Sequence, residues 1–166
     1  TWAKKLWGHT QLPYFGYFEP ARKTLVMDIN TGSGTLVHEL THALMHYDFP
    51  DAPTWFEEGL GSLHEACQVS PGGILGITNW RLPILQKAML GGTLRPLRDL
   101  VTRRDFRGAK ESFNYAQARY FVMFMQERGV LYKFYKHFRA TYSVKAPNDV
   151  KAIEHIFGSG ISKVDA

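Results

Sequence analysis

The sequence predicts an α+β domain that is predominantly helical, with a small N-terminal sheet followed by a bundle of helices. The first observation is a β-branched, partly alternating run at residues 23–29. The second is the spacing of apolar residues at three- and four-residue steps over residues 33–47, 113–128 and 131–142. The third is the length of 166 residues. This length suits a single domain, residues 1–166, with its own hydrophobic core.

Proline and glycine residues set most of the expected boundaries, because they interrupt helices and strands. The strand at residues 23–29 is bounded by Pro20 and by an Asn-Thr-Gly sequence. In chain order, we expect helices at residues 33–47, 54–67, 80–90, 113–128, 131–142 and 147–157, separated by turns or loops at 50–53, 71–73 and 93–111, the last with a short turn at 97–101.

Composition excludes several classes of protein. The apolar fraction of 45% and the charged fraction of 21% are those of a globular domain, not of a disordered chain. No apolar run approaches the ~18 residues of a membrane-spanning helix. The single cysteine, Cys67, rules out an internal disulfide and is expected to be a small buried residue. The chain opens at Thr1, so we expect a piece of a longer precursor; the compartment stays open, with an extracytoplasmic bacterial one favoured.

The net charge of +5 is concentrated in one basic stretch. Its members are Arg95, Arg98, Arg103, Arg104, Arg107 and Lys110. A nucleic-acid patch, a solvated loop face and the lining of a cleft for acidic substrates are the three interpretations. The solvated loop is preferred, and no nucleic-acid partner is expected, because no nucleic-acid-binding fold is recognised.

The pentapeptide His-Glu-Leu-Thr-His, which begins at His38, fits the pattern H-E-x-x-H. On a helix, His38 and His42 lie one turn apart on the same face, so both imidazoles can reach one metal ion. Glu39 projects to the side, where it can act as general base on a water molecule. The flanking apolar residues predict a buried helix, on which uncompensated polar groups are costly. These residues are Val37, Leu40, Ala43 and Leu44. The alternative is a surface helix whose histidines bind nothing.

A catalytic zinc site has three protein ligands and leaves the fourth position to water, so a third ligand is required. His46 continues the four-residue spacing from His42, but it lies too far along the helix to share an ion with His38. Asp48 follows His42 by six residues. Other zinc peptidases place a ligand there, but only where a glycine at position 45 lets the chain turn back, and this chain has Met45.

The second helix offers a better third ligand. Thr54 and Glu57 fit a capping box, in which the Glu57 side chain folds back to the Thr54 amide. Glu58 lies about 100° further round the helix and can face the first helix. Gly59 permits close approach of two helices. The alternative is that Glu58 is only an exposed acid in a first helical turn. Candidates to orient the histidines are Ser62, Glu65 and Asp28.

Together these residues resemble the gluzincins, metallopeptidases of the peptidase MA clan. The sequence Trp-Phe-Glu-Glu-Gly at residues 55–59 is similar to the WxxEG signature of M1-type enzymes and their small bacterial relatives. The resemblance implies a zincin-like catalytic domain with one Zn²⁺ ion bound by His38, His42 and Glu58, and with Glu39 as general base. The short spacing from His42 to Glu58 points to a compact relative, not to an M1 enzyme itself.

The resemblance covers roughly residues 22–140. It implies that Tyr115, near the start of a later helix, donates a hydrogen bond to the developing oxyanion. The alternative is that Tyr115 is an aromatic residue that only packs at a helix start. Residues 26–30 lack the glycine and the glutamate with which M1 aminopeptidases hold a free amine. We therefore expect an endopeptidase.

The sequence thus predicts a zinc-dependent peptidase that acts on a peptide or protein substrate. One rival is a catalytically silent, zinc-bearing binding or scaffold module, although such a protein should have lost Glu39 or a ligand. Another is a zinc hydrolase with a non-peptide substrate, because the same chemistry attacks other carbonyls. The oligomeric state is not readable from the sequence.

Overall fold

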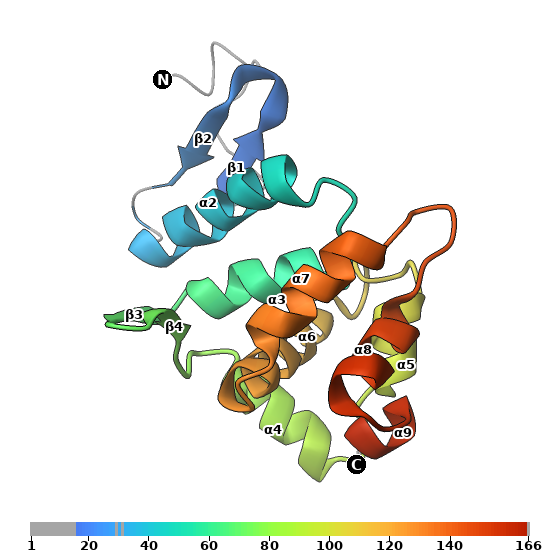
Figure 1. Ribbon diagram of the computed structural model, residues 1–166. Helices are drawn as coiled ribbons and strands as arrows, with labels where there is room; N and C mark the ends of the chain where they lie inside the picture. Colours follow the sequence, from blue (N-terminus) through green and yellow to red (C-terminus); the bar gives the residue numbers. More distant parts are fainter. Residues whose placement is uncertain (1–15, 29, 31, 166) are drawn as a thin grey trace.

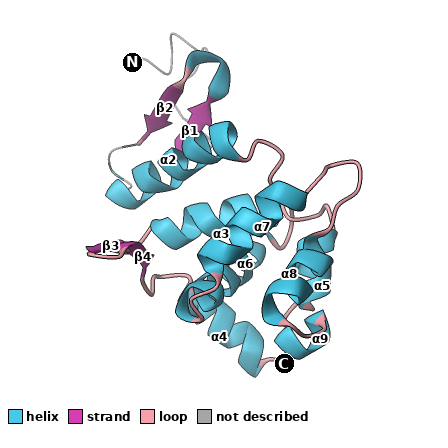
Figure 2. Cartoon of the chain, viewed as in Figure 1, coloured by secondary structure: helices cyan, strands magenta, loops and turns pink. Residues whose placement is uncertain are grey.

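The structure of the chain, a computed structural model, describes residues 16–28, 30 and 32–165 (Figure 1). In chain order its elements are β1 (Gly16–Glu19), the 3-10 turn η1 (Pro20–Arg22), β2 (Thr24–Met27), α2 (Ser33–Asp48), α3 (Thr54–His64), β3 (Cys67–Ser70), β4 (Gly73–Gly76), α4 (Leu82–Leu90), α5 (Leu97–Thr102), α6 (Glu111–Glu127), α7 (Leu131–Thr141), α8 (Asp149–Phe157) and α9 (Ile161–Val164). The predicted class is confirmed at the coarse level, because the described residues form an α+β structure that is mostly helical (Figure 2).

Two sheets occur in the described residues, and each is an antiparallel hairpin. In the first, Tyr17 of β1 lies opposite Val26 of β2. The predicted strand at residues 23–29 is therefore β2, shortened at both ends, and its last residue, Ile29, lies outside the described residues. In the second hairpin, Cys67 of β3 lies opposite Gly76 of β4. The second helix was expected to continue to residue 67, and this is wrong, because α3 ends at His64 and β3 begins at Cys67. The loop expected at residues 71–73 corresponds to the turn of this hairpin at residues 71–72, and Gly73 begins β4.

The predicted helices are otherwise close to those observed. The helix α2 ends one residue beyond the predicted range, and α6, α7 and α8 differ from their ranges by one or two residues at an end. The short turn expected at residues 97–101 is the helix α5. A glycine with positive φ, Gly158, follows α8, as expected for a helix that stops at glycine. Among the described helices, none combines the length and the apolar composition needed to cross a membrane.

The hydrophobic core lies between α3, α6 and α7, which cross one another in Figure 1. Phe56 of α3 and Phe134 and Phe138 of α7 are completely buried, and their rings meet edge to face or tilted. Val122 and Met125 of α6 are also completely buried in this core. The core therefore holds α3 firmly at its centre.

Gly59 makes the contact between α3 and α6 possible. A Cβ atom at this position would lie 2.9 Å from Val122 Cγ2 and 3.1 Å from the Ala118 carbonyl oxygen. The sequence predicted a close approach at Gly59, and the structure confirms it, with α6 as the partner helix. The helix α3 therefore packs against α6 on the side of Gly59, and it packs against α2 on another side.

The helix α2 lies between the β1–β2 hairpin and α3 (Figure 1). Burial was expected for Val37, Leu40, Ala43 and Leu44. It is wrong for Leu40 and Leu44, which are exposed together with Leu36 and Tyr47, whereas Val37 and Ala43 are half-buried. The residues that α2 buries are His38, Thr41 and Met45. Periodicity locates an apolar face on a helix, but it does not say which face another element covers. In the part of the chain that the structure describes, the covered face carries the polar residues of the site.

Candidate metal centre

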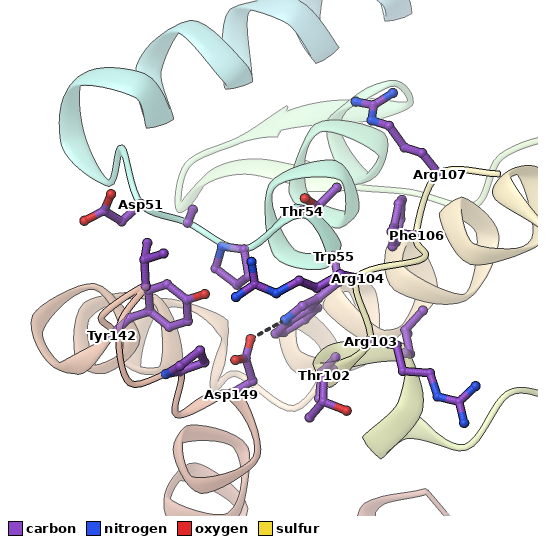
Figure 3. A pocket seen from close by; sticks show the side chains of 16 residues that line it. Asp51, Thr54, Trp55, Thr102, Arg103, Arg104, Phe106, Arg107, Tyr142 and Asp149 are labelled. Carbon is purple, nitrogen blue, oxygen red and sulfur yellow. Dashed lines mark hydrogen bonds between the residues drawn. The ribbon is translucent and has the colours of Figure 1, made fainter.

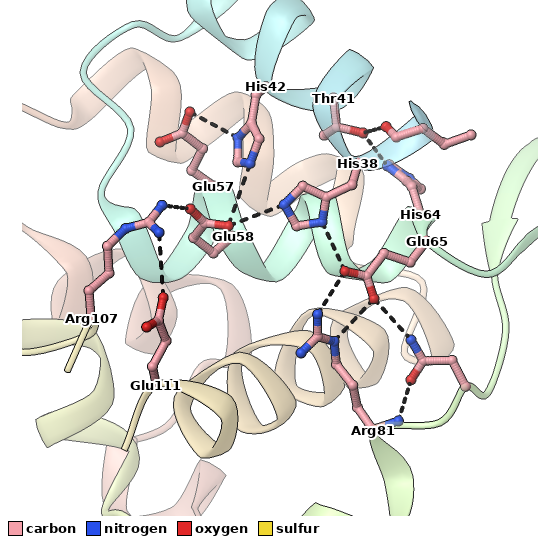
Figure 4. A network of polar contacts seen from close by, with 12 residues as sticks. His38, Thr41, His42, Glu57, Glu58, His64, Glu65, Arg81, Arg107 and Glu111 are labelled. Carbon is pink, nitrogen blue, oxygen red and sulfur yellow. Dashed lines mark hydrogen bonds and ion pairs between the residues drawn. The ribbon is translucent and has the colours of Figure 1, made fainter. Parts of the chain in front are cut away.

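The two histidines of α2 and one glutamate of α3 meet at a single point (Figure 4). The Nε2 atom of His38 lies 3.2 Å from Glu58 Oε2. The Nε2 atom of His42 lies 3.5 Å from the same oxygen. His38 is 7% exposed and Glu58 is 2% exposed, so the group faces the protein interior. The sequence prediction that these residues converge is therefore confirmed.

The spacing of these atoms fits a small metal ion. One nitrogen or oxygen atom from each residue lies within 4.8 Å of the others. A tetrahedral ion with bonds of about 2.0–2.1 Å separates its ligand atoms by roughly 3.3 Å. The two separations from Glu58 Oε2, 3.2 and 3.5 Å, agree with this value. Two imidazoles and one carboxylate could therefore hold a metal ion without rearrangement of the backbone.

Each histidine is oriented by a carboxylate on its other ring nitrogen. His38 Nδ1 lies 3.1 Å from Glu65 Oε1, and His42 Nδ1 lies 3.2 Å from Glu57 Oε1. Such contacts fix the ring so that Nε2 points to the metal position. The predicted capping box is wrong, because no side chain caps α3 among the described residues and Glu57 contacts His42 instead.

Glu65 is held by a further layer of polar groups. Arg81 donates from Nε to Glu65 Oε2 at 3.1 Å and from Nη2 to Oε1 at 2.8 Å. Asn79 donates to Oε2 at 3.3 Å. Of the three candidates to orient the histidines, Glu65 is therefore confirmed. The hydroxyl of Ser62 has no hydrogen-bond partner among the described residues, and Asp28 is exposed and accepts hydrogen bonds from Asn30.

Gly61 leaves room for the His38 ring. A Cβ atom at Gly61 would lie 3.0 Å from His38 Nε2 and 3.1 Å from Cε1, closer than ordinary van der Waals contact. Any larger residue would push the imidazole away from Glu58. The two glycines of α3 thus allow two close contacts. Gly59 allows the approach of α6, and Gly61 allows the approach of the His38 ring.

The electrostatics of the site favour positive charge between the three side chains. Burial by itself would lower the pKa of His42, but Glu57 and Glu58 outweigh it and raise that pKa to about 10. The pKa of His38 is also raised, because Glu58 and Glu65 outweigh the effect of burial. Burial would raise the pKa of Glu58, but the two histidines hold it far below its usual range. A divalent cation would meet the same favourable field.

Glu39 lies beside the first strand. Its side chain approaches Gly16, and the Phe18 amide donates a hydrogen bond to it. Burial raises the pKa of Glu39 above its ordinary value, although His38 and His42 act in the opposite direction. A half-buried carboxylate with a raised pKa, on the residue that follows His38, is the kind of group that can take part in proton transfer.

Tyr115 and Arg107 complete the surroundings of Glu58. The Tyr115 ring stacks on the His38 ring with 6.4 Å between centroids. Burial, together with the charge of Glu58 and a hydrogen bond to it, raises the pKa of Tyr115, so the phenol remains a proton donor. Arg107 donates to Glu58 Oε1 and leaves Oε2 to the histidines. Sequence reasoning missed Arg107 in this role, because it follows Glu58 by 49 residues and carries no local signal.

The other candidates for a third ligand lie elsewhere. Asp48 accepts hydrogen bonds from Tyr135 and Arg139 of α7 on the surface of the protein. The His46 ring packs edge to face on Phe18 and Tyr47. His64, to which no role was assigned, lies 3.2 Å from the Thr41 hydroxyl. The geometry therefore favours Glu58 over both alternatives.

Comparison with protein-family models, with curated proteins and with solved structures finds no match to this chain. The interpretation of the site therefore depends on its own geometry and chemistry.

Replacing Glu65 with Gln tests the orientation of His38. The amide cannot accept the imidazole proton as a carboxylate does, so we expect metal affinity to fall about 10- to 100-fold. Affinity is measured by competition with a chromophoric chelator, and far-UV circular dichroism checks the fold. Glu127→Gln, at an exposed residue on α6, is the matched control. Equal affinity in Glu65→Gln and the parent protein would remove Glu65 from the site.

Proposed function

We propose that the protein is a zinc-dependent peptidase of the gluzincin type, which hydrolyses internal peptide bonds. The observation that carries the proposal is the convergence of His38 and His42 Nε2 on Glu58 Oε2, with Glu39 on the next position of α2. Two imidazoles and one carboxylate are the ligand set of catalytic zinc in several peptidases, and they leave one position open.

Zinc is favoured over other metals by the chemistry of the ligands. Imidazole nitrogens suit zinc, copper, iron and nickel, whereas calcium and magnesium prefer sites made of oxygen atoms alone. The separations of 3.2 and 3.5 Å between Glu58 Oε2 and the two Nε2 atoms agree with the tetrahedral coordination that zinc prefers. Carboxylates on both Nδ1 atoms, from Glu65 and Glu57, add the second layer that zinc histidines commonly have.

In the proposed reaction, a zinc ion held by the three ligands would lower the pKa of a water molecule to about 7 and polarise the substrate carbonyl. Glu39 accepts a proton from the attacking water molecule as the water oxygen bonds to the carbonyl carbon. The Tyr115 hydroxyl donates a hydrogen bond to the oxygen on which negative charge develops. Glu39 then delivers its proton to the leaving nitrogen as the carbon–nitrogen bond breaks.

Replacing Glu39 with Gln removes the proposed base and keeps its shape. We expect turnover of internally quenched peptides to fall about 10²- to 10⁴-fold, because the amide cannot take up the proton. Metal content, measured by mass spectrometry of the purified protein, should not change. Glu127→Gln serves again as the control that retains activity.

Three outcomes of this assay separate the rival functions. Cleavage that a chelator stops and Glu39→Gln abolishes supports the peptidase. Stoichiometric metal without cleavage of any peptide favours a binding or scaffold module, or a hydrolase with another substrate. Unchanged hydrolysis by Glu39→Gln would exclude the proposed mechanism.

Replacing Tyr115 with Phe tests the oxyanion donor. Loss of one such donor should lower kcat by about 10²- to 10³-fold, with little change in KM, because the hydrogen bond strengthens only as charge develops. Tyr132→Phe, at an exposed tyrosine of α7, is the control. If kcat of Tyr115→Phe equals that of the control, Tyr115 is only a packing residue.

A further inference from the structure

A cavity of about 350 Å³ lies beside the metal centre, at the N-terminal end of α3 (Figure 3). It is bounded by the first residues of α3, by the end of α5 and the loop that follows it, and by the segment between α7 and α8. The residues that matter for its chemistry are Thr54, Trp55, Arg103, Arg104, Phe106 and Arg107. We call this cavity the arginine pocket.

The three arginines of the pocket differ in their partners. Arg103 pairs with Asp99, 3.3 Å away, and Arg107 contacts Glu58 and Glu111. Arg104 extends across the cavity in Figure 3. Within the described part of the chain, no carboxylate forms an ion pair with Arg104. A guanidinium fork without a carboxylate partner is suited to bind one from a ligand.

The acidic groups of the pocket do not offset Arg104. Asp149 is 4% exposed, and it accepts a hydrogen bond of 2.7 Å from Trp55 Nε1. Burial raises the pKa of Asp149, and the hydrogen bond from Trp55 acts in the opposite direction. Asp51 is exposed at the rim. Neither Asp51 nor Asp149 forms an ion pair with Arg104 among the described residues, so its guanidinium is available to a ligand.

The start of α3 adds to this positive potential. The first amides of a helix have no partners within the helix, and the helix dipole places partial positive charge there. In the described residues no side chain caps α3, and Pro53 and Thr54, at this end, line the cavity. A carboxylate in the arginine pocket would meet both the Arg104 guanidinium and the end of the helix.

One residue, Arg107, belongs both to the pocket and to the surroundings of the metal centre. Arg107 lines the cavity and also donates to Glu58. Thr54 precedes Glu58 by one helical turn, a rise of about 6 Å. The Phe106 ring lies 5.3 Å from the Tyr115 ring, which itself stacks on His38. A peptide bound across the metal centre could therefore place a neighbouring side chain in this cavity.

We infer that the arginine pocket binds the carboxylate of a glutamate or aspartate side chain near the scissile bond, so that the substrates are acidic peptides. The inference rests on the proposed peptidase function and extends it to substrate class. For Arg103, Arg104 and Arg107 of the basic stretch, the inference favours the interpretation that they line a cleft for acidic substrates. Arg95 has a different role, because it is paired with Asp105 and Asn114.

The test measures binding, so that it does not depend on cleavage. The protein carries Glu39→Gln and is loaded with zinc, which keeps the peptides intact. The probes are N-acetylated, C-amidated Ala-Ala-Glu-Ala-Ala and its Gln counterpart, titrated by calorimetry. The matched variants are Arg104→Gln in the pocket and Arg98→Gln on α5, which is exposed and outside it.

We expect the Glu peptide to bind about tenfold more tightly than the Gln peptide, because the Gln side chain cannot form the charged hydrogen bond with Arg104. This preference should vanish in Arg104→Gln and persist in Arg98→Gln. Arg104 is exposed and has no ion-pair partner among the described residues, so its replacement should leave the fold unchanged by circular dichroism. A Gln peptide with a free C-terminal carboxylate should bind no better than its amide.

Other results overturn the inference. Equal binding of the Glu and Gln peptides, no binding of either, or a preference that survives Arg104→Gln would each exclude the arginine pocket as an acid site. A preference for the free C-terminal carboxylate would assign the pocket to a chain end instead of a side chain. If the Glu preference depends on Arg104 but the parent protein cleaves no peptide, the pocket stands and the peptidase function fails.

Discussion

The arrangement depends on one buried carboxylate, Glu58, placed between two imidazole nitrogens. Its Oε2 atom faces His38 and His42, and its Oε1 atom accepts a hydrogen bond from Arg107. A buried charge is tolerated only with compensating partners, so removal of any one of them leaves the others uncompensated. The contact of the two α2 histidines with α3 and the attraction of the site for a cation follow from this group, while Glu65 and Glu57 orient the two rings.

The rest of the fold brings Glu58 to that place and holds it there. The aromatic core fixes α3 against α6 and α7, and Gly59 sets how closely α3 and α6 approach. Glu65, held by Arg81, orients one imidazole, and Glu57 orients the other. The α2 helix consequently turns its polar face inward and leaves apolar side chains exposed. Here the geometry of a site takes precedence over the usual partition of apolar and polar residues.

Local patterns predicted much of this. Helical spacing located α2, α6 and α7, and the four-residue step placed His38 and His42 on one face. The order Glu-Gly after an aromatic pair pointed to Glu58. Contacts between distant segments could not be predicted: Glu57 matches a capping box in sequence, yet its partner is 15 residues away. The β3–β4 hairpin was missed because its strands are only 4 residues long and mostly exposed, which leaves little periodicity to recognise.

Metal stoichiometry tests the central claim most directly. The purified chain and a Glu58→Ala variant would be dialysed against trace zinc, and their metal content would be measured by mass spectrometry with a Glu127→Ala control. The account predicts a single tightly held zinc ion in the parent and in the control, and its loss in Glu58→Ala while the helical circular dichroism persists. If Glu58→Ala retained as much zinc as the parent, or if the parent bound none, the site would not be a metal centre.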